Sequence, residues 1–211
     1  MSDVFISYSR KDTQFIREIL ELLAANKREA WIDLHDIDYS VKWWEEICAG
    51  IDGADNFVLF VSQSSLESLF VHREIEYALS HQKRIIPFLI KRVDEEAMFE
   101  AWRSSPDLSK YEQMTRANWK SIQDIQWIDY TLLNDASLAV ETLLATVDTD
   151  PQRVKLHTRL LLRLRDWESQ GQNPSGLLRG EELAQYEQWR TDTHQKGTPP
   201  HATEELSLIH I

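Results

Sequence analysis

At positions 56–61 the chain reads Asn56-Phe57-Val58-Leu59-Phe60-Val61, and this apolar run decides which kind of fold the sequence can form. Apolar residues that follow one another without alternation are typical of a strand whose two faces are both covered. A serine-rich turn occupies 62–68, and residues 70–79 then place apolar side chains at helical spacing. A buried strand that leads through a short turn into an amphipathic helix is the repeating unit of a parallel α/β sheet.

Segments of the same two kinds lie on both sides of this unit. We predict further strands over 4–8, 30–32, 84–90 and 125–128, amphipathic helices over 15–23, 43–53 and 136–147, a weaker helix over 93–102, and irregular chain over 106–123. Within the serine-rich turn, Ser64 and Glu67 have the spacing of a helix capping box. Strands that alternate with helices in this way predict a flavodoxin-like, doubly wound, parallel five-stranded sheet of the α/β class over residues 1–147.

The remaining residues predict a separate helical segment. Asp150-Pro151 is a typical helix start, with Asp as the N-cap and Pro at the first helical position. A second helix is expected over 180–192, and two short helices bury too little surface to be stable alone. We therefore expect a C-terminal helical appendage over 148–195 that packs on the sheet domain or on a further domain. A linker over 196–211 would then lead to further C-terminal domains of a longer protein.

The composition excludes several classes of protein and of chemistry. The formal net charge of −12 argues against nucleic acid as a partner, and no apolar run is long enough for a transmembrane helix. The N-terminus has no signal-peptide pattern and the single cysteine, Cys48, is expected to be a small buried residue, so we expect a cytoplasmic protein. The seven histidines lack partners at metal-ligand spacing and the six glycines form no phosphate-binding motif. We therefore expect neither a metal nor a cofactor.

Ligands of doubly wound sheets bind at the carboxyl ends of the strands, near the point where the strand order reverses. In this chain those ends lead into Ser9-Arg10, into Asp33 and its loop, into the serine-rich turn, and into the segment after the fourth strand. Phe70 and Glu74 lie four residues apart at the edge of the apolar helix stripe, just beyond one of these ends. A ring and a carboxylate in this arrangement could hold a flat, partly cationic ligand, or they could be a solvated helix flank. The residue pattern leaves both interpretations open.

Six short motifs in order, taken together, resemble a Toll/interleukin-1 receptor (TIR) domain, and most closely the TIR domains of bacteria. They are Asp3-Val4-Phe5-Ile6-Ser7-Tyr8-Ser9, Trp31-Ile32-Asp33, Trp43 with Ile47, Ala54-Asp55-Asn56-Phe57-Val58-Leu59, Ser68-x-Phe70-Val71-x-x-Glu74 and Arg84-Ile85-Ile86-Pro87. The resemblance implies the same flavodoxin-like fold that the periodicity predicts. The segment from His157 to Glu181 is similar to the helical linker that joins bacterial TIR domains to STAND ATPase or WD-repeat regions.

TIR domains fall into two functional classes, and the resemblance implies roles for several residues. Some TIR domains are scaffolds that recruit other TIR domains, whereas others cleave NAD into nicotinamide and ADP-ribose or a cyclic product. In the second class the glutamate that matches Glu74 is the catalytic carboxylate, and the aromatic residue that matches Phe70 stacks on nicotinamide. The resemblance also implies substrate contacts at Ser9, Arg10, Asp33 and Trp43, with Arg10 toward the phosphates and Trp43 at the mouth of the pocket.

The loop over 33–42 matches the BB loop of the family, which inserts under a neighbouring TIR domain, so Ile37 and Tyr39 are the implied self-association contacts. Two residues depart from the family pattern: Phe70 stands where Trp is more frequent, and Ser40 stands where Gly is usual. We expect an NAD hydrolase or cyclase of bacterial defence or signalling, which takes NAD as its substrate. The alternative, which the two departures favour, is a non-catalytic adaptor that acts through TIR–TIR association.

Overall fold

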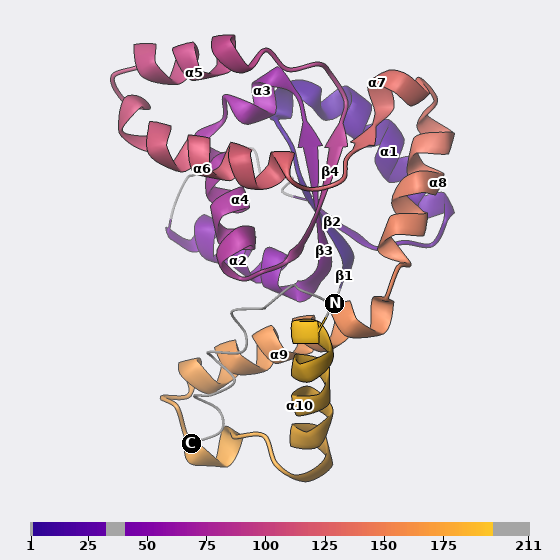
Figure 1. Ribbon diagram of the computed structural model, residues 1–211, viewed down its shortest axis with the longest axis vertical. Coiled ribbons are helices and arrows are strands. Elements are labelled where there is room, and N and C mark those ends of the chain that lie inside the picture. The colour runs from indigo at the N-terminus through magenta and orange to yellow at the C-terminus, as the bar shows by residue number, and fades with distance from the viewer. Residues whose placement is uncertain (1, 33–40, 196–211) are drawn as a thin grey trace.

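The computed structural model describes residues 2–32 and 41–195 of the 211-residue chain. Within these residues, five parallel strands form one sheet in the order β2-β1-β3-β4-β5, with helices on both faces (Figure 1). The strands are β1 (Ser2–Ser7), β2 (Ala30–Ile32), β3 (Ala54–Val61), β4 (Arg84–Leu89) and β5 (Ile128–Asp129). The strand order reverses between β1 and β3, as it does in doubly wound sheets. The predicted fold class is confirmed.

The central strand β3 is buried along its whole length. Phe57, Leu59 and Val61 pack into the core on one face of the sheet, and Val58 and Phe60 pack into the core on the other face. β3 pairs with β1 on one side and with β4 on the other. The unbroken apolar run is therefore explained by a strand with two covered faces and two strand neighbours.

Different helices cover the two faces of the sheet (Figure 1). The face toward which Phe57 points is covered by α2 (Val41–Gly53), α4 (Leu69–Ser80), α5 (Glu95–Ser104) and α6 (Glu112–Gln123). The opposite face is covered by α1 (Thr13–Ala25) and α8 (Ala136–Val147). Shorter helices occupy the connections: η1 (Arg10–Asp12), α3 (Gln63–Leu66), η2 (Ser109–Tyr111) and α7 (Tyr130–Leu133).

Helix α6 lies where the sequence predicts irregular chain, so that prediction is wrong. Its buried residues Thr115, Asn118, Trp119 and Ile122 share one face of the helix, although two of them are polar. Asn118 is tolerated there because its Nδ2 donates a hydrogen bond of 2.8 Å to the backbone oxygen of His72 in α4. The apolar pattern is interrupted where α6 makes this polar contact, and for that reason periodicity does not reveal the helix.

The last strand is shorter than predicted and begins later. β5 pairs with only the final two residues of β4, whereas the sequence predicts a strand over 125–128. The ring of Trp127 instead packs edge-on against Trp119 of α6, and its Nε1 donates a hydrogen bond of 2.9 Å to the backbone oxygen of Ile122. Trp127, which precedes β5, therefore packs against α6 and is not part of the sheet.

The serine-rich turn contains a short helix that the sequence does not predict, and its caps differ from the expected ones. Ser62 is the N-cap of α3 and forms a capping box with Ser65, while Ser68 is the N-cap of α4. The predicted capping box of Ser64 with Glu67 is wrong, because the turn holds two helix starts rather than one. The Ser64 hydroxyl caps neither helix and donates a hydrogen bond to Asp12 instead.

Residues 151–195 form a helical appendage below the amino ends of the strands (Figure 1). It consists of α9 (Pro151–Ser169), η3 (Pro174–Gly176) and α10 (Gly180–Gln195), with a small core that includes Leu160, Tyr186 and Trp189. α9 packs against α2 and β3, so of the two expected supports, the sheet domain or a further domain, the structure shows the sheet domain. Within the described residues, no helix is long and apolar enough to span a membrane.

The start of α9 differs from its prediction in one detail. Asp150 occupies the predicted N-cap position, but its side chain does not cap the helix and its backbone adopts a left-handed φ of 51°. The carboxylate lies 3.1 Å from Arg153 Nε instead. Asp150 therefore forms an ion pair with the first turn of α9 and makes no capping hydrogen bond from its side chain.

Candidate functional site

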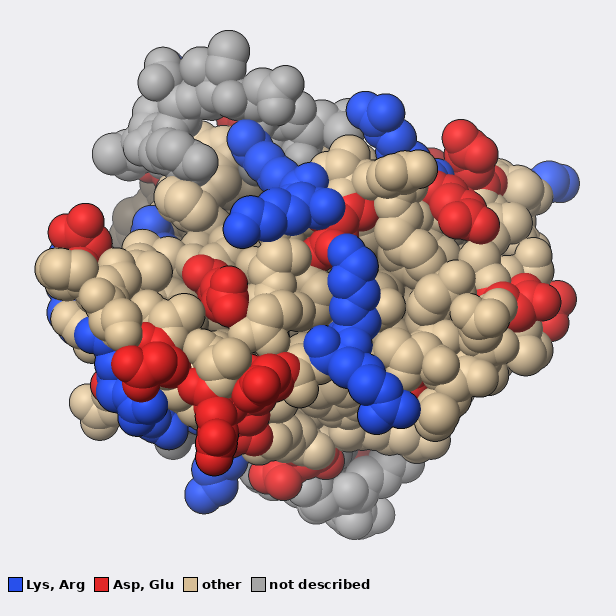
Figure 2. All heavy atoms as spheres, turned by 90° about the horizontal axis from the view of Figure 1, so that it is seen from above, with Lys and Arg blue, Asp and Glu red and all other residues tan. Residues whose placement is uncertain are grey.

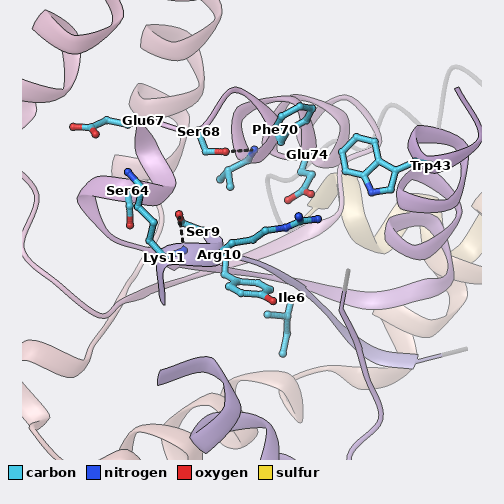
Figure 3. A pocket seen from close by; sticks show the side chains of 12 residues that line it. Ile6, Ser9, Arg10, Lys11, Trp43, Ser64, Glu67, Ser68, Phe70 and Glu74 are labelled. Atoms are coloured by element: carbon cyan, nitrogen blue, oxygen red, sulfur yellow. Dashed lines mark hydrogen bonds between the residues drawn. The ribbon is translucent and has the colours of Figure 1, made fainter. Parts of the chain in front are cut away.

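A cavity of about 360 Å³ lies at the carboxyl ends of β1 and β3, where the strand order reverses (Figure 3). Its walls come from the segment that follows β1, from α2, and from the segment that leads from α3 into α4. The cavity brings together these sequence-predicted site residues: Ser9, Arg10, Trp43, Phe70 and Glu74. Residues that are distant in sequence meet here because parallel strands present all their carboxyl ends at one edge of the sheet.

Glu74 is held in the cavity wall between α4 and β1. It lies in the second turn of α4, and only 7% of its surface is exposed. The hydroxyl of Ser7, the last residue of β1, donates a hydrogen bond of 2.5 Å to Glu74 Oε2. Burial of a carboxylate is unfavourable unless hydrogen bonds satisfy it, so this contact stabilises the side chain in its buried position. The interpretation of Glu74 as part of a solvated helix flank is wrong.

Aromatic rings form the wall beside Glu74 (Figure 3). Trp43 of α2 and Phe70 of α4 meet edge to face, with their ring centroids 5.3 Å apart. Trp43 is buried, whereas Trp44 is only partly buried and has the guanidinium of Arg73 at 4.2 Å from its ring centroid. Of these two neighbouring tryptophans, one is therefore buried and the other is partly exposed. The Trp43–Phe70 contact holds both rings in place, so they form a preformed apolar surface.

The buried carboxylate of Asp12 ties together three of the segments that follow the strands. Ser62 Oγ and Ser64 Oγ donate hydrogen bonds to Asp12 Oδ2 at 2.6 and 2.8 Å, and Lys91 Nζ lies 2.5 Å from Asp12 Oδ1. Asp12 follows β1, the serines follow β3, and Lys91 follows β4. Burial by itself raises the pKa of the Asp12 carboxyl, but the hydrogen bonds from Lys91, Ser62 and Ser64 outweigh burial and hold this pKa below its usual value.

Several residues that line or support the cavity are not among the predicted site residues: Ser7, Tyr8, Lys11, Asp12, Ser64, Glu67 and Ser68. Tyr8 and Lys11 adjoin Ser9 and Arg10, so the strand-end rule could have included them. Ser7 and Asp12 carry no local signal, because their partners lie in other elements and far along the chain.

The face at the carboxyl ends of the strands has a different charge pattern from the chain as a whole. Although the formal net charge is −12, Lys and Arg side chains form a band across the middle of this face, between groups of Asp and Glu (Figure 2). Arg10 and Lys11 belong to the cavity lining itself. The site therefore suits a ligand with anionic groups, a flat ring, and a region that becomes positively charged.

The motifs, the sheet and the cavity agree with a known family. The family model described as TIR domain matches residues 4–144, which is more than half of the 211-residue chain. The chain belongs to the TIR domain family.

Other proteins resemble this TIR domain in sequence or in structure. The NAD(+) hydrolase tir-1 of Caenorhabditis elegans is 32% identical over 94 residues, which are 40% of this chain and 10% of that protein, so the chain spans about a tenth of the length of this relative. The TIR domain of the Toll-related receptor TRR-2 from Hydra magnipapillata has a TM-score of 0.52 at 14% identity, over 70% of this chain and 98% of that one. The TIR domains of the activated Roq1 resistosome have a TM-score of 0.56 at 18% identity, over 70% and 99%. At these identities the two structures show the shared fold alone.

Part of the predicted site of this TIR domain lies outside the described residues. Asp33, Ile37, Tyr39 and Ser40 belong to the segment 33–40. The substrate contact at Asp33 and the self-association contacts of the BB loop therefore stay predictions.

Proposed function

We propose that this TIR domain is an NAD⁺ nucleosidase, which cleaves NAD into nicotinamide and ADP-ribose or a cyclic form of ADP-ribose in bacterial defence or signalling. The observation that carries the proposal is the burial of Glu74 in the wall of a cavity that also holds an aromatic pair and two cationic side chains. The partial similarity to a protein named NAD(+) hydrolase supports the same assignment.

The reaction suits a single carboxylate. When the bond between ribose C1′ and the nicotinamide nitrogen breaks, its electron pair leaves with nicotinamide, which departs as a neutral molecule and needs no acid. Positive charge then develops on C1′ and the ring oxygen of the ribose, as it does in glycoside cleavage. A preorganised Glu74 carboxylate would stabilise this charge by about 3–4 kcal/mol in a site that excludes water. Water then adds to C1′ with loss of a proton, or a nucleophile of the same molecule closes a ring.

We assign the other cavity residues to substrate binding. The Trp43–Phe70 pair offers its apolar surface to the nicotinamide ring, and Arg10 with Lys11 supplies positive charge for the diphosphate. The cavity volume of about 360 Å³ is near the lower end of the range for small-molecule sites. We therefore infer that it takes the nicotinamide and its ribose, and that the rest of NAD extends beyond it.

Release of nicotinamide from NAD by the purified protein tests the proposal. Glu74→Gln should lower kcat at least about 100-fold. The amide carries no charge to stabilise the transition state, yet its oxygen can still accept the hydrogen bond from Ser7. Glu76→Gln is the matched control and should leave kcat unchanged, because Glu76 lies on the same helix but is exposed.

The outcomes separate the two functional classes of TIR domain. Full activity of Glu74→Gln would remove Glu74 from the mechanism. A wild-type protein that self-associates but releases no nicotinamide at any protein concentration would be an adaptor instead.

A further inference from the structure

Ser7 is buried behind the cavity rather than exposed in it. Only 1% of its surface is accessible, and the lining includes its neighbours Ile6 and Tyr8 but not Ser7. Its side chain contacts Glu74, through the 2.5 Å hydrogen bond between Ser7 Oγ and Glu74 Oε2. A hydroxyl in this position does not reach a ligand in the cavity, and any effect on the reaction must pass through the Glu74 carboxylate.

Strand β1 gives Ser7 a fixed position. The strand lies between β2 and β3, and Ser7 is in register with Leu59 of the buried strand β3. The three residues before Ser7 are also buried. Strand β1 is paired with β2 as far as Ile6 and with β3 as far as Ser7. A buried strand of this kind opens only with a large part of the fold, so Ser7 Oγ is a rigid point of attachment for a side chain from α4.

The hydrogen bond restricts the carboxylate of Glu74. An ionised carboxylate only accepts hydrogen bonds, so the Ser7 hydroxyl is the donor. A hydroxyl that donates to an ionised carboxylate forms a charge-assisted hydrogen bond, which is stronger than one between neutral groups. The Glu side chain has several rotatable bonds, and a strong bond to one oxygen selects one orientation of the carboxylate plane.

We propose that Ser7 is a positioning residue, which holds the Glu74 carboxylate in the orientation that stabilises the ribose cation of NAD. The inference rests on the proposed function of Glu74. Ser7 makes no contact with NAD in this role, so the loss of its hydroxyl acts on the transition state rather than on substrate binding. A hydrogen bond that serves only to join β1 to α4 would instead affect the stability of the protein and leave kcat per folded molecule unchanged.

Steady-state kinetics of Ser7→Ala in the full chain separates these two roles. We expect kcat to fall roughly 10- to 100-fold while KM changes by less than about threefold, because a misplaced catalytic group lowers the rate without weakening binding. Ser7→Thr keeps the hydroxyl and should recover most of kcat. Thr115→Val is the matched control: Thr115 is buried in α6 and its hydroxyl donates to the backbone oxygen of Tyr111, so this variant loses a buried hydroxyl without touching Glu74. Its kcat should equal that of the wild type.

A second measurement follows the hydrogen bond itself and does not depend on catalysis. Ser7→Ala should lower Tm in the wild-type background and should lower it less in the Glu74→Ala background, where the acceptor is already missing. If Ser7→Ala does not fold, Ser7→Cys takes its place in both measurements, because the thiol fills the same space but donates only weakly.

The results distinguish failure of this inference from failure of the proposed function. An inactive wild-type protein overturns both. An active wild type with an equally active Ser7→Ala overturns only the role of Ser7. Equal losses of kcat in Ser7→Ala and Thr115→Val, or additive changes in Tm, do the same, because they show that the Ser7 hydroxyl does not act through Glu74.

Discussion

Phe70 is the residue whose identity bears most directly on substrate affinity, because it stands where TIR domains more often have Trp. Its ring meets Trp43 edge to face and contributes to the cavity lining. We predict that Phe70→Ala raises KM for NAD about 2- to 12-fold, since an aromatic pair is worth about 0.5–1.5 kcal/mol beyond burial. Phe70→Trp should keep or lower KM, because stacking grows with ring area. An unchanged KM in Phe70→Ala, together with a lower Tm, would mean that the ring serves core packing only.

Asp12 makes the stability of the site dependent on pH. Its folded-state pKa lies below the ordinary value of 3.8, so its hydrogen bonds contribute stability that is complete above about pH 4 and is lost as the pH falls through the folded-state pKa. We predict that Asp12→Asn lowers the free energy of unfolding by roughly 1–3 kcal/mol at neutral pH. Urea unfolding at neutral and at acidic pH should show this difference shrinking below about pH 4. A difference that is independent of pH would assign the effect to packing rather than to charge.

At the scale of elements, α9 is joined to α2 directly and to α4 through Asp52 of α2. Asp52, near the end of α2, accepts hydrogen bonds from Tyr77 of α4 at 2.8 Å and from Arg165 of α9 at 2.9 Å. Lys83 is buried at the same junction and donates to the backbone oxygen of Asp52 and to Thr158 of α9, each at 3.3 Å. α2 also carries Trp43 of the cavity, and α4 carries Glu74. The same group of polar contacts therefore holds the appendage on the domain and holds α2 and α4 together at the site.

Lys83 provides a test of this junction. Burial lowers its pKa to about 8, against the opposing effect of Asp52 and Asp55. Above that pH the folded protein binds fewer protons than the unfolded chain, so stability rises with pH until the unfolded lysine also titrates. We predict that the difference in free energy of unfolding between the wild type and Lys83→Met grows by about 1 kcal/mol in favour of the wild type between pH 8 and pH 9. Urea unfolding at these two pH values measures it.

Cys48 acts in the opposite direction over the same pH range, and the comparison with Lys83→Met removes its contribution because both proteins contain it. Cys48 is buried, as the sequence predicts, and burial raises the pKa of its thiol to about 11, so its ionisation favours the unfolded chain. A difference between wild type and Lys83→Met that stays flat between pH 8 and pH 9 would show that burial does not lower the pKa of Lys83.

At the scale of the whole molecule, we predict that activity depends on self-association through the BB loop. The cavity of about 360 Å³ is small for NAD, so part of the substrate would lie outside it unless a neighbouring molecule completes the site, and a site in contact with water stabilises charge less than an enclosed one. Specific activity should therefore rise with protein concentration, and Ile37→Asp, which places a charge at the predicted contact, should flatten the rise. Nicotinamide release measured across a wide dilution series tests this.

Leu132→Asp is the matched control for that experiment. Leu132 is 73% exposed on α7, so the same chemical change is made at an exposed apolar position outside the loop. The rise of specific activity should persist in this variant. Constant specific activity across the whole dilution series, in the wild type and in both variants, would show that the monomer is the active species.

The amino-acid sequence by itself determines the layers of this fold and the edge at which the site lies. The run at 56–61 requires a strand with two covered faces, and Val71, Ile75 and Ala78 of α4 require a helix with one buried stripe. These patterns are local, because the spacing of apolar residues along the chain predicts which face of a helix or strand is buried. The chain order of strands and helices then places Arg10, Phe70 and the other strand-end residues at one edge, as the cavity confirms.

Only the tertiary structure decides which of these residues contact one another. Ser7 and Glu74 are separated by 67 positions, and Asp12 and Lys91 by 79, so no periodicity links either pair. Each pair depends on the register of the strands and on how far a helix extends over them. The same reason explains α6, whose buried Asn118 is favourable only because a backbone oxygen of α4 lies opposite it. A polar residue in a core has no signature in the local sequence, since its partner is supplied by another part of the fold.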